Sequence, residues 1–278
     1  MRHAYLIMAH NNFKVLEQLI KALDDSRNDI YVHIDRRSAI PSGLKCENGR
    51  LFVLNNRIKV IWGDVAQIKA EYLLYEAAFA NGPYDFYHLI SGVHFPLKSQ
   101  DELNSFFENH EGECILIKNE VNEEDVNMWF GRYHFFMKHL IDRRKWVNKL
   151  YHLGWRFILF LQRGFKFRDT SFVHGKASQW CSLTEEAVKA LIDYKEASLK
   201  RFSRSFCSDE FFVLSVIGAM PLPIIDNQDL TYIEFKNTTP RVFTMDDYDM
   251  LMNSNALFAR KFGDSHLDLV CRIAEKIS

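Results

Sequence analysis

The amino-acid sequence predicts an α/β fold with a mainly parallel central sheet, and three observations predict it. The chain opens with an apolar strand over residues 4–9, a helix, and a second strand over residues 30–34. That order favours parallel strands joined by a right-handed crossover. Residues 84–90 are apolar and carry no charge after Asp85, as is typical of a strand buried on both faces. Polar residues, here called strand tips, directly follow these strands, at the edge where open α/β sheets bind ligands.

Composition limits the classes of function. The chain has 278 residues, 47% of them hydrophobic, with a net charge of −1 and a pI near 6.8. The chain can bury one large core or two closely fused lobes. It has no overall basic surface, so its composition does not predict a nucleic-acid partner. The five cysteines are odd in number and form no C-x-x-C pair, so we expect reduced thiols and neither a disulfide framework nor a zinc site. No Gly-rich dinucleotide or P-loop motif is present.

Two strand tips near the N-terminus are the first candidate site. His10 to Asn12 follow the first strand and can cap a helix whose apolar residues recur at helical spacing from Val15 to Leu23. Asp35-Arg36-Arg37 follow the second strand. A carboxylate there can accept hydrogen bonds from a ribose or base. The other interpretation of Asp35 is an ion pair with Arg36 or Arg37 at the surface.

The third tip, Ser91 to His94, follows the central strand and is interpreted as the floor of a pocket; the alternative is a plain polar turn. Residues 51–54 and 60–61 read as short strands, and Trp62 before the helix over 68–79 is either core or a stacking wall. Ser99 to Glu102 predicts a capping box. Residues 113–117 follow as another strand.

Residues 131–168 have a different character. Apolar residues from Tyr133 to Leu161 recur at helical spacing, and Lys138, Arg143, Arg144, Lys145 and Lys149 lie between them. One interpretation is a pair of helices packed on the domain with a solvated basic side. The other is a face that rests on anionic lipid or an acidic acceptor.

Residues 174–278 contain two further loops of interest. Residues 174–183 form a loop of small residues that enters a strand, and Thr184 caps the helix that follows. Ser208-Asp209-Glu210 precede the apolar helix 211–217, with Ser208 or Asp209 expected as its cap and Glu210 in its first turn, where it either favours the helix dipole or works chemically. A strand over 230–235, a helix over 245–252, an apolar segment over 257–262 and a helix over 267–277 close the chain.

Taken in order, these pieces resemble the core-2/I-branching β-1,6-N-acetylglucosaminyltransferase family, glycosyltransferase family 14, which includes the peptide xylosyltransferases. The matching stretches are 4–10, 33–38, Trp62-Gly63 with Gln67 and Ala70, 87–98, 178–180 with 182–184, 208–210, and 257–262. Each motif alone is weak. Their common order along the whole chain makes the resemblance specific.

The resemblance implies one GT-A-like domain over 1–278, a three-layer α/β/α fold with a mixed, mainly parallel sheet. Residues 1–120 would form the Rossmann-like half that binds a nucleotide sugar. Residues 121–278 would form the acceptor and catalytic half, with 131–168 as a basic amphipathic helical insertion. It further implies an inverting mechanism with a UDP-sugar donor and no divalent metal or other cofactor.

Site residues are implied by matching positions. Glu210 matches the catalytic base, and Arg241 and Lys261 match the cations that contact the diphosphate in place of a metal. Asp35 matches the acid that holds the uridine. The remaining donor-site positions are Met8, Ala9, His10, Arg36, Trp62, Ser91, Gly92 and His94, and the acceptor side is assigned to Gln179, Trp180 and Asp209. Asp246, Asp247 and Asp249 are interpreted as surface acids rather than a metal motif.

One position departs from the family pattern. His94 stands where relatives commonly have Asp, which leaves N-acetylglucosamine, xylose or another hexose open as the donor sugar. No export signal or membrane anchor is recognised. We therefore expect a cytoplasmic, bacterial-type enzyme of surface polysaccharide synthesis, with a glycan or lipid-linked glycan acceptor and peripheral contact of 131–168 with the inner face of the membrane. The alternatives are a catalytically silent member that binds nucleotide or glycan as an assembly partner, and a membrane-peripheral scaffold.

Overall fold

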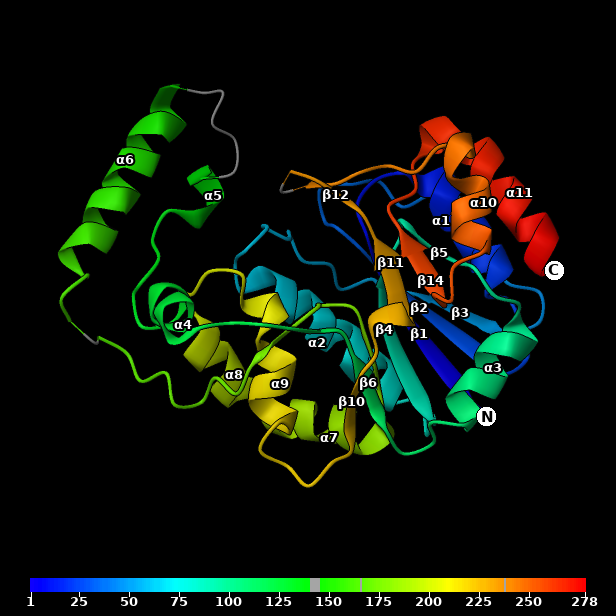
Figure 1. The fold of residues 1–278 in the computed structure, drawn as a ribbon, viewed down its shortest axis with the longest axis horizontal. Helices are drawn as coiled ribbons and strands as arrows, with labels where there is room; N and C mark the ends of the chain where they lie inside the picture. Colours follow the sequence, from blue (N-terminus) through cyan, green and yellow to red (C-terminus); the bar gives the residue numbers. More distant parts are fainter. Residues whose placement is uncertain (141–145, 166, 238) are drawn as a thin grey trace.

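A seven-stranded mixed sheet is the centre of the computed structural model, which describes residues 1–140, 146–165, 167–237 and 239–278 (Figure 1). Its strand order is β10-β6-β9-β4-β1-β2-β3. The strands are β1 (His3–Ala9), β2 (Asn28–Ile34), β3 (Arg50–Val53), β4 (Phe86–Ser91), β6 (Cys114–Leu116), β9 (Cys181–Leu183) and β10 (Ile224–Asp226). All pairings are parallel except those of β9, which runs antiparallel to both β4 and β6.

The predicted central strand is confirmed. β4 lies in the middle of the sheet, and every residue of β1 except Met8, and every residue of β2 and β4, is buried. Strands covered on both faces need apolar side chains in both directions, which is why they read as apolar runs. The predicted strand at 60–61 is wrong: Val60 lies in a loop, where its amide donates to Asp35 instead of to a neighbouring strand.

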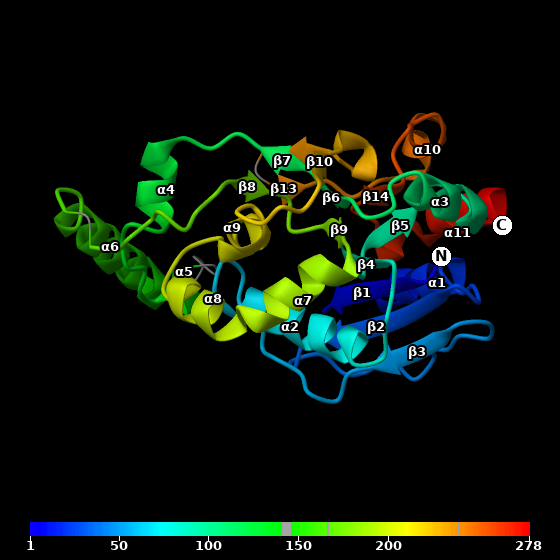
Figure 2. The ribbon, with the colours of Figure 1, turned by 90° about the horizontal axis from the view of Figure 1, so that it is seen from below.

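Helices cover both faces, which gives three layers (Figures 1 and 2). One face packs against α1 (Phe13–Ala22), α3 (Gln100–Glu108) and α11 (Leu267–Ile277). The other packs against α2 (Ala66–Phe79), α7 (Glu185–Asp193), α8 (Lys195–Phe202) and α9 (Phe212–Ile217). This confirms the predicted α/β/α arrangement around a mixed, mainly parallel sheet.

A second, three-stranded sheet lies on the α1 side. It contains β11 (Thr231–Ile233), β14 (Phe258–Arg260) and β5 (His94–Pro96), in the order β11-β14-β5. The smaller elements are β7 (Lys118–Asn119), β8 (Lys176–Ala177), β12 (Phe235–Lys236), β13 (Thr239–Pro240), α4 (Glu123–Trp129), α5 (Met137–Leu140), α6 (Trp146–Leu161), α10 (Tyr248–Met252), and the 3-10 helices η1 (Ser208–Glu210), η2 (Gln228–Leu230), η3 (Met245–Asp247) and η4 (Asp264–His266).

Caps explain several helix starts. Ser99 and Glu102 form the predicted capping box of α3, and the Thr184 hydroxyl accepts the amide of Ala187 at the start of α7. The expected cap at Asn12 is wrong. Its backbone is left-handed and its side chain makes no cap on α1. Asp264 caps that helix from a distance, accepting the Val15 amide at 3.0 Å.

Helices α5 and α6 project from the body beside α4, at one extreme of the molecule in both views (Figures 1 and 2). Of the predicted basic residues in this insertion, Arg143, Arg144 and Lys145 lie outside the described residues. Within the part of the chain that is described, no helix combines the length and the apolar content needed to cross a bilayer.

Candidate active site

The predicted strand tips meet at the carboxyl edge of the large sheet. The Asp35 amide donates to the Ala9 carbonyl at 2.8 Å, and the Gly92 amide donates to the Met8 carbonyl at 2.8 Å. Gly92 is required by this approach, because a Cβ added there would lie 2.8 Å from the Ala9 Cβ. The sheet therefore brings together the tips of β1, β2 and β4, as the sequence predicts.

Strand β14 delivers Lys261 to the same edge. The Phe262 amide donates to the Val93 carbonyl at 3.0 Å, which fixes the end of β14 beside the turn between β4 and β5. Burial, and then the charge of Lys261, lower the pKa of His10, while Asp35 acts in the opposite direction. His10, Asp35 and Lys261 are therefore close enough to affect one another electrostatically.

Asp35 is engaged within the protein. Its carboxylate accepts hydrogen bonds from Nε and Nη2 of Arg37, at 2.9 and 2.8 Å, and from the Val60 amide at 2.9 Å. Burial acts to raise the pKa of Asp35, but these hydrogen bonds outweigh it and lower the pKa to about 2. The ion pair with a neighbouring arginine, one of the two interpretations from the sequence, is present, and Asp35 also anchors the loop that leads to Trp62.

Arg36 and Trp62 lie on the surface beside that loop. Arg36 is exposed, and its amide donates to the Ile58 carbonyl at 3.1 Å. Trp62 is 59% exposed and meets Phe206 edge-on at 5.4 Å. The interpretation of Trp62 as a core residue is therefore wrong, and its free face is available for stacking.

Arg241 is held by two carboxylates. Its guanidinium donates to both oxygens of Asp247, at 2.8 and 2.7 Å, and to Glu234 at 2.7 Å. Asp247, which the sequence assigned to the surface, is instead the main partner of Arg241 and is only 14% exposed. The segment that carries Arg241 nevertheless lies beside Lys261, because the Phe243 amide donates to the Lys261 carbonyl at 2.9 Å.

Glu210 closes the short 3-10 helix η1 rather than opening α9. Its carboxylate is 38% exposed and forms an ion pair of 3.0 Å with Lys176 of β8. The expected cap at Ser208 or Asp209 is wrong, since α9 begins after Phe211 and has no side-chain cap. Glu210 therefore lies before α9 and not in its first turn. Its carboxylate is oriented by Lys176 and is partly open to solvent.

Beneath Glu210 lies a buried acidic pair, Asp209 and Glu71. Asp209 accepts a hydrogen bond from Gln67 at 2.9 Å, and Glu71 accepts one from Gln179 at 2.7 Å. The second oxygen of each carboxylate has no partner among the described residues. Burial, and then the charge of Glu210, raise the pKa of Asp209 to about 7. Burial, and then Asp209, raise the pKa of Glu71 well above its usual value.

These contacts connect the two halves of the predicted site. Gln179, which is bonded to Glu71, also reaches the Met8 sulfur at 3.5 Å. The next residue, Trp180, lies between His94, with ring centres 5.0 Å apart, and Arg260, whose guanidinium carbon is 5.3 Å from the Trp180 ring centre. Gln67 and Glu71, one turn apart on α2, thus bond to Asp209, which precedes Glu210, and to Gln179, which precedes Trp180.

Three residues of the site were not predicted from the sequence: Glu71, Lys176 and Arg260. A signal existed for Glu71, because α2 is apolar around most of its circumference and an acid on it must be buried. Arg260 follows Phe258 by two residues, so it shares a face of the strand with a core residue. Lys176 gives no such signal, since its pairing with Glu210 depends on the fold.

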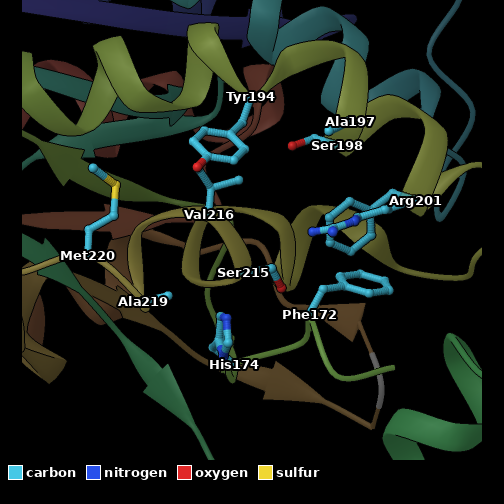
Figure 3. A pocket seen from close by; sticks show the side chains of 11 residues that line it. Phe172, His174, Tyr194, Ala197, Ser198, Arg201, Ser215, Val216, Ala219 and Met220 are labelled. Carbon is cyan, nitrogen blue, oxygen red and sulfur yellow. The ribbon is translucent and has the colours of Figure 1, made fainter. Parts of the chain in front are cut away.

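No group of three or more His, Cys, Asp or Glu side chains that could hold a metal ion is found in the described ranges. A cavity of about 200 Å³ lies between α8 and α9. Figure 3 shows the side chains that line it, among them Phe172, His174, Tyr194, Arg201 and Met220. The predicted site residues do not line it. The candidate site is therefore defined by the convergence of polar side chains at the sheet edge.

Comparison with known proteins decides the family. A family model described as "Branch: Core-2/I-Branching enzyme" matches residues 3–251. The chain belongs to this family. A relative in Arabidopsis thaliana, the beta-glucuronosyltransferase GlcAT14B, is 24% identical over 289 residues, covering 94% of this chain and 63% of the plant protein. The chain thus spans less than two thirds of that relative.

Solved structures with detectable similarity include mouse xyloside xylosyltransferase 1 in its apo form. It has a TM-score of 0.38 and 10% identity, with 92% of this chain and 97% of the mouse chain covered. Staphylococcus aureus TarS, residues 1–349, has a TM-score of 0.38 and 11% identity, with 82% and 59% covered.

Membership of this glycosyltransferase family confirms the resemblance recognised in the sequence, and with the observed layers it confirms the GT-A-like α/β/α class. Sugar transfer is the chemistry of the family. The donor sugar, the acceptor, the roles of individual residues and the independence from metal stay predictions, as does a cytoplasmic location.

Proposed function

We propose that this chain is an inverting, metal-independent glycosyltransferase that transfers a sugar from a UDP-sugar to a hydroxyl of a glycan or glycolipid acceptor in surface polysaccharide synthesis. The observation that supports it most is the position of Glu210, a partly exposed carboxylate oriented by Lys176. The neighbouring Asp209 is bonded to Gln67 of α2, and Glu71, one turn further along α2, is bonded to Gln179, which also reaches Met8 at the end of β1. A carboxylate in this position can act on an acceptor that lies against the donor.

The proposed reaction uses Glu210 as a general base. Glu210 removes the proton from the acceptor hydroxyl while that oxygen attacks the anomeric carbon of the donor. The bond from this carbon to the diphosphate oxygen breaks on the opposite face, and its electron pair leaves with UDP. A general base of this kind contributes about 10²–10⁴ to the rate.

Cations at the sheet edge would offset the charge that develops on UDP. Lys261 is the first candidate, since it lies beside the tips of β1 and β4. Arg241 would add a second cation if the diphosphate shares it with Asp247 and Glu234. Fixed cations can stabilise a leaving diphosphate without a divalent ion. Met8, Ala9, His10, Asp35, Arg36 and Trp62 would line the nucleotide end, Ser91, Gly92 and His94 the sugar end, and Gln179, Trp180 and Asp209 the acceptor side.

The candidates for the donor sugar are N-acetylglucosamine or another hexose, and the pentose xylose. The plant relative is by name a glucuronosyltransferase, so a uronic acid belongs among the candidates. A screen of UDP-sugars by thermal shift should identify the donor, because a ligand that binds only the folded protein raises its melting temperature.

The decisive experiment measures UDP release in excess EDTA with wild type, Glu210→Gln and Glu186→Gln. Glu186 is an exposed acid on α7 and serves as the matched control. We expect activity in EDTA that falls at least about 100-fold in Glu210→Gln and is retained in the control. Loss of activity in EDTA, or full activity of Glu210→Gln, would contradict the proposal.

The second candidate is a catalytically silent member that binds nucleotide. His94, in place of the usual Asp at the sugar end of the site, favours it. It predicts calorimetric binding of UDP without turnover over a broad panel of acceptors.

A further inference from the structure

Helix α6 exposes a stripe of large apolar side chains. Trp146, Leu150, Leu153, Phe157, Phe160 and Leu161 are each at least 57% exposed. They recur every three or four residues and therefore share one side of the helix. Phe165 and Phe167 extend the exposed apolar surface beyond its end. Soluble proteins seldom expose a contiguous patch of this kind without a partner.

The opposite side of α6 is already occupied by the protein. Trp155 donates to His134 at 3.3 Å, Gln162 accepts the amide of Tyr133 at 2.8 Å, and Tyr151 stacks on His139 with ring centres 4.1 Å apart. Polar and aromatic contacts thus orient α6 so that its apolar stripe faces outward, at one extreme of the molecule (Figures 1 and 2).

The charges beside the stripe all have one sign. Lys149, Arg156 and Arg163 are exposed, and they are spaced seven residues apart, which places them in one row along the helix. The described residues 146–165 contain no Asp or Glu. A second copy of this face would bring further bases and no acid, so charge complementarity argues against self-association and for an anionic partner.

We propose that α6 binds the surface of an anionic lipid bilayer, with its axis parallel to the membrane plane. Its apolar stripe would enter the acyl boundary while Lys149, Arg156 and Arg163 contact lipid phosphates. The 16-residue helix is about 24 Å long, shorter than the hydrocarbon core, so it lies on the bilayer rather than across it.

The position of α6 relative to the candidate site has a consequence that rests on the proposed function. Phe206 contacts Trp155 of α6, with ring centres 6.4 Å apart, and also Trp62. Phe206 precedes η1, which carries Glu210. Membrane binding through α6 would therefore hold the catalytic loop near the bilayer, where a lipid-linked acceptor is presented.

Flotation with lipid vesicles tests the membrane proposal without requiring activity. We expect wild type to float with phosphatidylcholine vesicles that contain 30% phosphatidylglycerol, and to be released by 0.5 M NaCl. Leu150→Glu/Phe157→Glu should lower the partition coefficient at least about tenfold, because each substitution removes a large apolar side chain from the lipid. Met250→Glu, at an exposed apolar residue of α10, is the matched control and should float like wild type.

Three outcomes of the flotation experiment would overturn the membrane proposal. They are no flotation of wild type, equal flotation on purely neutral vesicles, and unchanged flotation of the double variant. Dimers in solution that dissociate on the same double substitution would show that a second copy covers the stripe instead. Brominated lipids should also quench the tryptophan fluorescence, and this quenching should be smaller in Trp146→Phe, because Trp146 is the most exposed tryptophan of α6.

A different observation concerns Arg260 and His94, which lie side by side on adjacent strands of the three-stranded sheet. They are directly paired in the register of β14 and β5. Arg260 Nε is buried without a partner, and its guanidinium makes no hydrogen bond or ion pair with the described residues; its contact is with the Trp180 ring. Burial lowers the pKa of Arg260 to about 10, which leaves it charged at neutral pH.

His94 presents a second unused donor. The Ser91 amide donates to His94 Nδ1 at 3.0 Å. An amide can only donate, so Nδ1 is the acceptor and the proton of the neutral ring lies on Nε2. Nε2 is buried and has no partner among the residues described. Two orphan donors on one face call for an acceptor that the protein does not supply.

The geometry points to Arg260 and His94 as the binding site of an anionic group of the donor, either its diphosphate or a carboxylate on its sugar. This inference rests on the proposed function. Arg241 is paired with Asp247 and Glu234, whereas Arg260 has no carboxylate partner in the described chain and precedes Lys261 directly. A carboxylate at position 94 would neutralise Arg260, whereas the neutral His94 leaves the site cationic.

Calorimetry with UDP, UDP-glucose and UDP-glucuronic acid tests this site. We expect Arg260→Gln to weaken binding of UDP-glucuronic acid at least about tenfold, as for loss of a charged hydrogen bond, and Arg260→Lys to recover part of it. Arg272→Gln, at an exposed arginine of α11, is the control. An equal loss for all three ligands assigns the site to the diphosphate, and a loss confined to UDP-glucuronic acid assigns it to the carboxylate.

Failure of this inference can be told from failure of the proposed function. If wild type binds UDP but Arg260→Gln, with an unchanged melting temperature, binds all three ligands like wild type, the assignment of Arg260 is overturned. If wild type binds none of the three ligands, the proposed function is wrong and the assignment of Arg260 falls with it.

Discussion

Lys176 Nζ lies 3.0 Å from a carboxylate oxygen of Glu210, and this ion pair orients the proposed base. The Lys176 ammonium also lies 4.9 Å from the centre of the Trp129 ring. The lysine is therefore fixed from two sides and can hold the Glu210 carboxylate in one orientation. An acceptor hydroxyl that approaches Glu210 would meet a carboxylate whose position is set before binding.

We predict that Lys176→Met lowers kcat about tenfold or more by releasing Glu210. Partly exposed ion pairs contribute little to stability, so the free energy of unfolding should change by less than about 1 kcal/mol. Lys176→Arg should keep most of the activity. The measurement is steady-state kinetics alongside urea unfolding, and a Lys176→Met enzyme with unchanged kcat would show that the ion pair has no catalytic role.

The buried pair of Asp209 and Glu71 predicts how stability depends on pH. The folded-state pKa of Asp209, about 7, is above its unfolded value of 3.8. A raised carboxyl pKa stabilises the folded state at low pH, and that stability is lost as the pH rises through the folded pKa. Between about pH 4 and pH 7 this acid therefore makes the protein less stable with increasing pH.

Asp209→Asn should remove that dependence. We expect the variant to be more stable than wild type at pH 8, by on the order of 2–4 kcal/mol, and close to wild type at pH 4. Urea unfolding at the two pH values measures the difference. Asp246→Asn, at an exposed acid, is the control. A gain of the same size at both pH values would mean that charge at Asp209 is not the cause.

The parallel part of the fold was predictable because strands buried on both faces leave a direct record in the sequence. Residues 84–90 read as a central strand for that reason, and β4 is one. The antiparallel strand β9 was predicted as a strand, but its insertion between β4 and β6 was not. Its three residues are too few to encode a partner, and the pairing is decided by tertiary packing.

The candidate site was predictable only in part, for a similar reason. Strand tips such as His10 and Ser91 follow apolar runs, so their common edge could be inferred. Glu71 and Arg260 reach the site from a helix and a strand read as core. Asp209 does not cap α9, because its carboxylate accepts a hydrogen bond from Gln67, which is distant in the sequence.

The contact between Asp264 and Val15 predicts a role for a residue outside the catalytic motifs. Asp264 accepts the Val15 amide in the first turn of α1, and the Asp264 amide donates to Asn12 at 3.1 Å. Asp264→Ala should lower the free energy of unfolding by about 1 kcal/mol, the usual effect of losing a cap. It should also weaken UDP binding, because it loosens the segment after Lys261. Asp264→Asn, which retains an accepting oxygen, should be closer to wild type in urea unfolding and calorimetry.

The ion pair of Asp35 and Arg37 gives a prediction with the opposite dependence on pH. The folded-state pKa of Asp35, about 2, is below its usual value of 3.8. Its stabilising contribution is present above pH 4 and is lost as the pH falls through 2. Arg37 is more than half exposed, so solvent screens the pair and we expect Asp35→Asn to cost about 1–2 kcal/mol at pH 7 and much less at pH 2.

The same pair separates two roles of Asp35 in binding. If Asp35 holds the uridine directly, Asp35→Asn should weaken UDP binding while Arg37→Gln should leave it nearly unchanged. If Asp35 acts by anchoring the loop from Val60 to Trp62, both substitutions should weaken UDP binding to a similar extent, because each breaks the network that fixes this loop. Calorimetry with UDP on the two variants decides between them. Binding unchanged in both would remove Asp35 from the nucleotide site altogether.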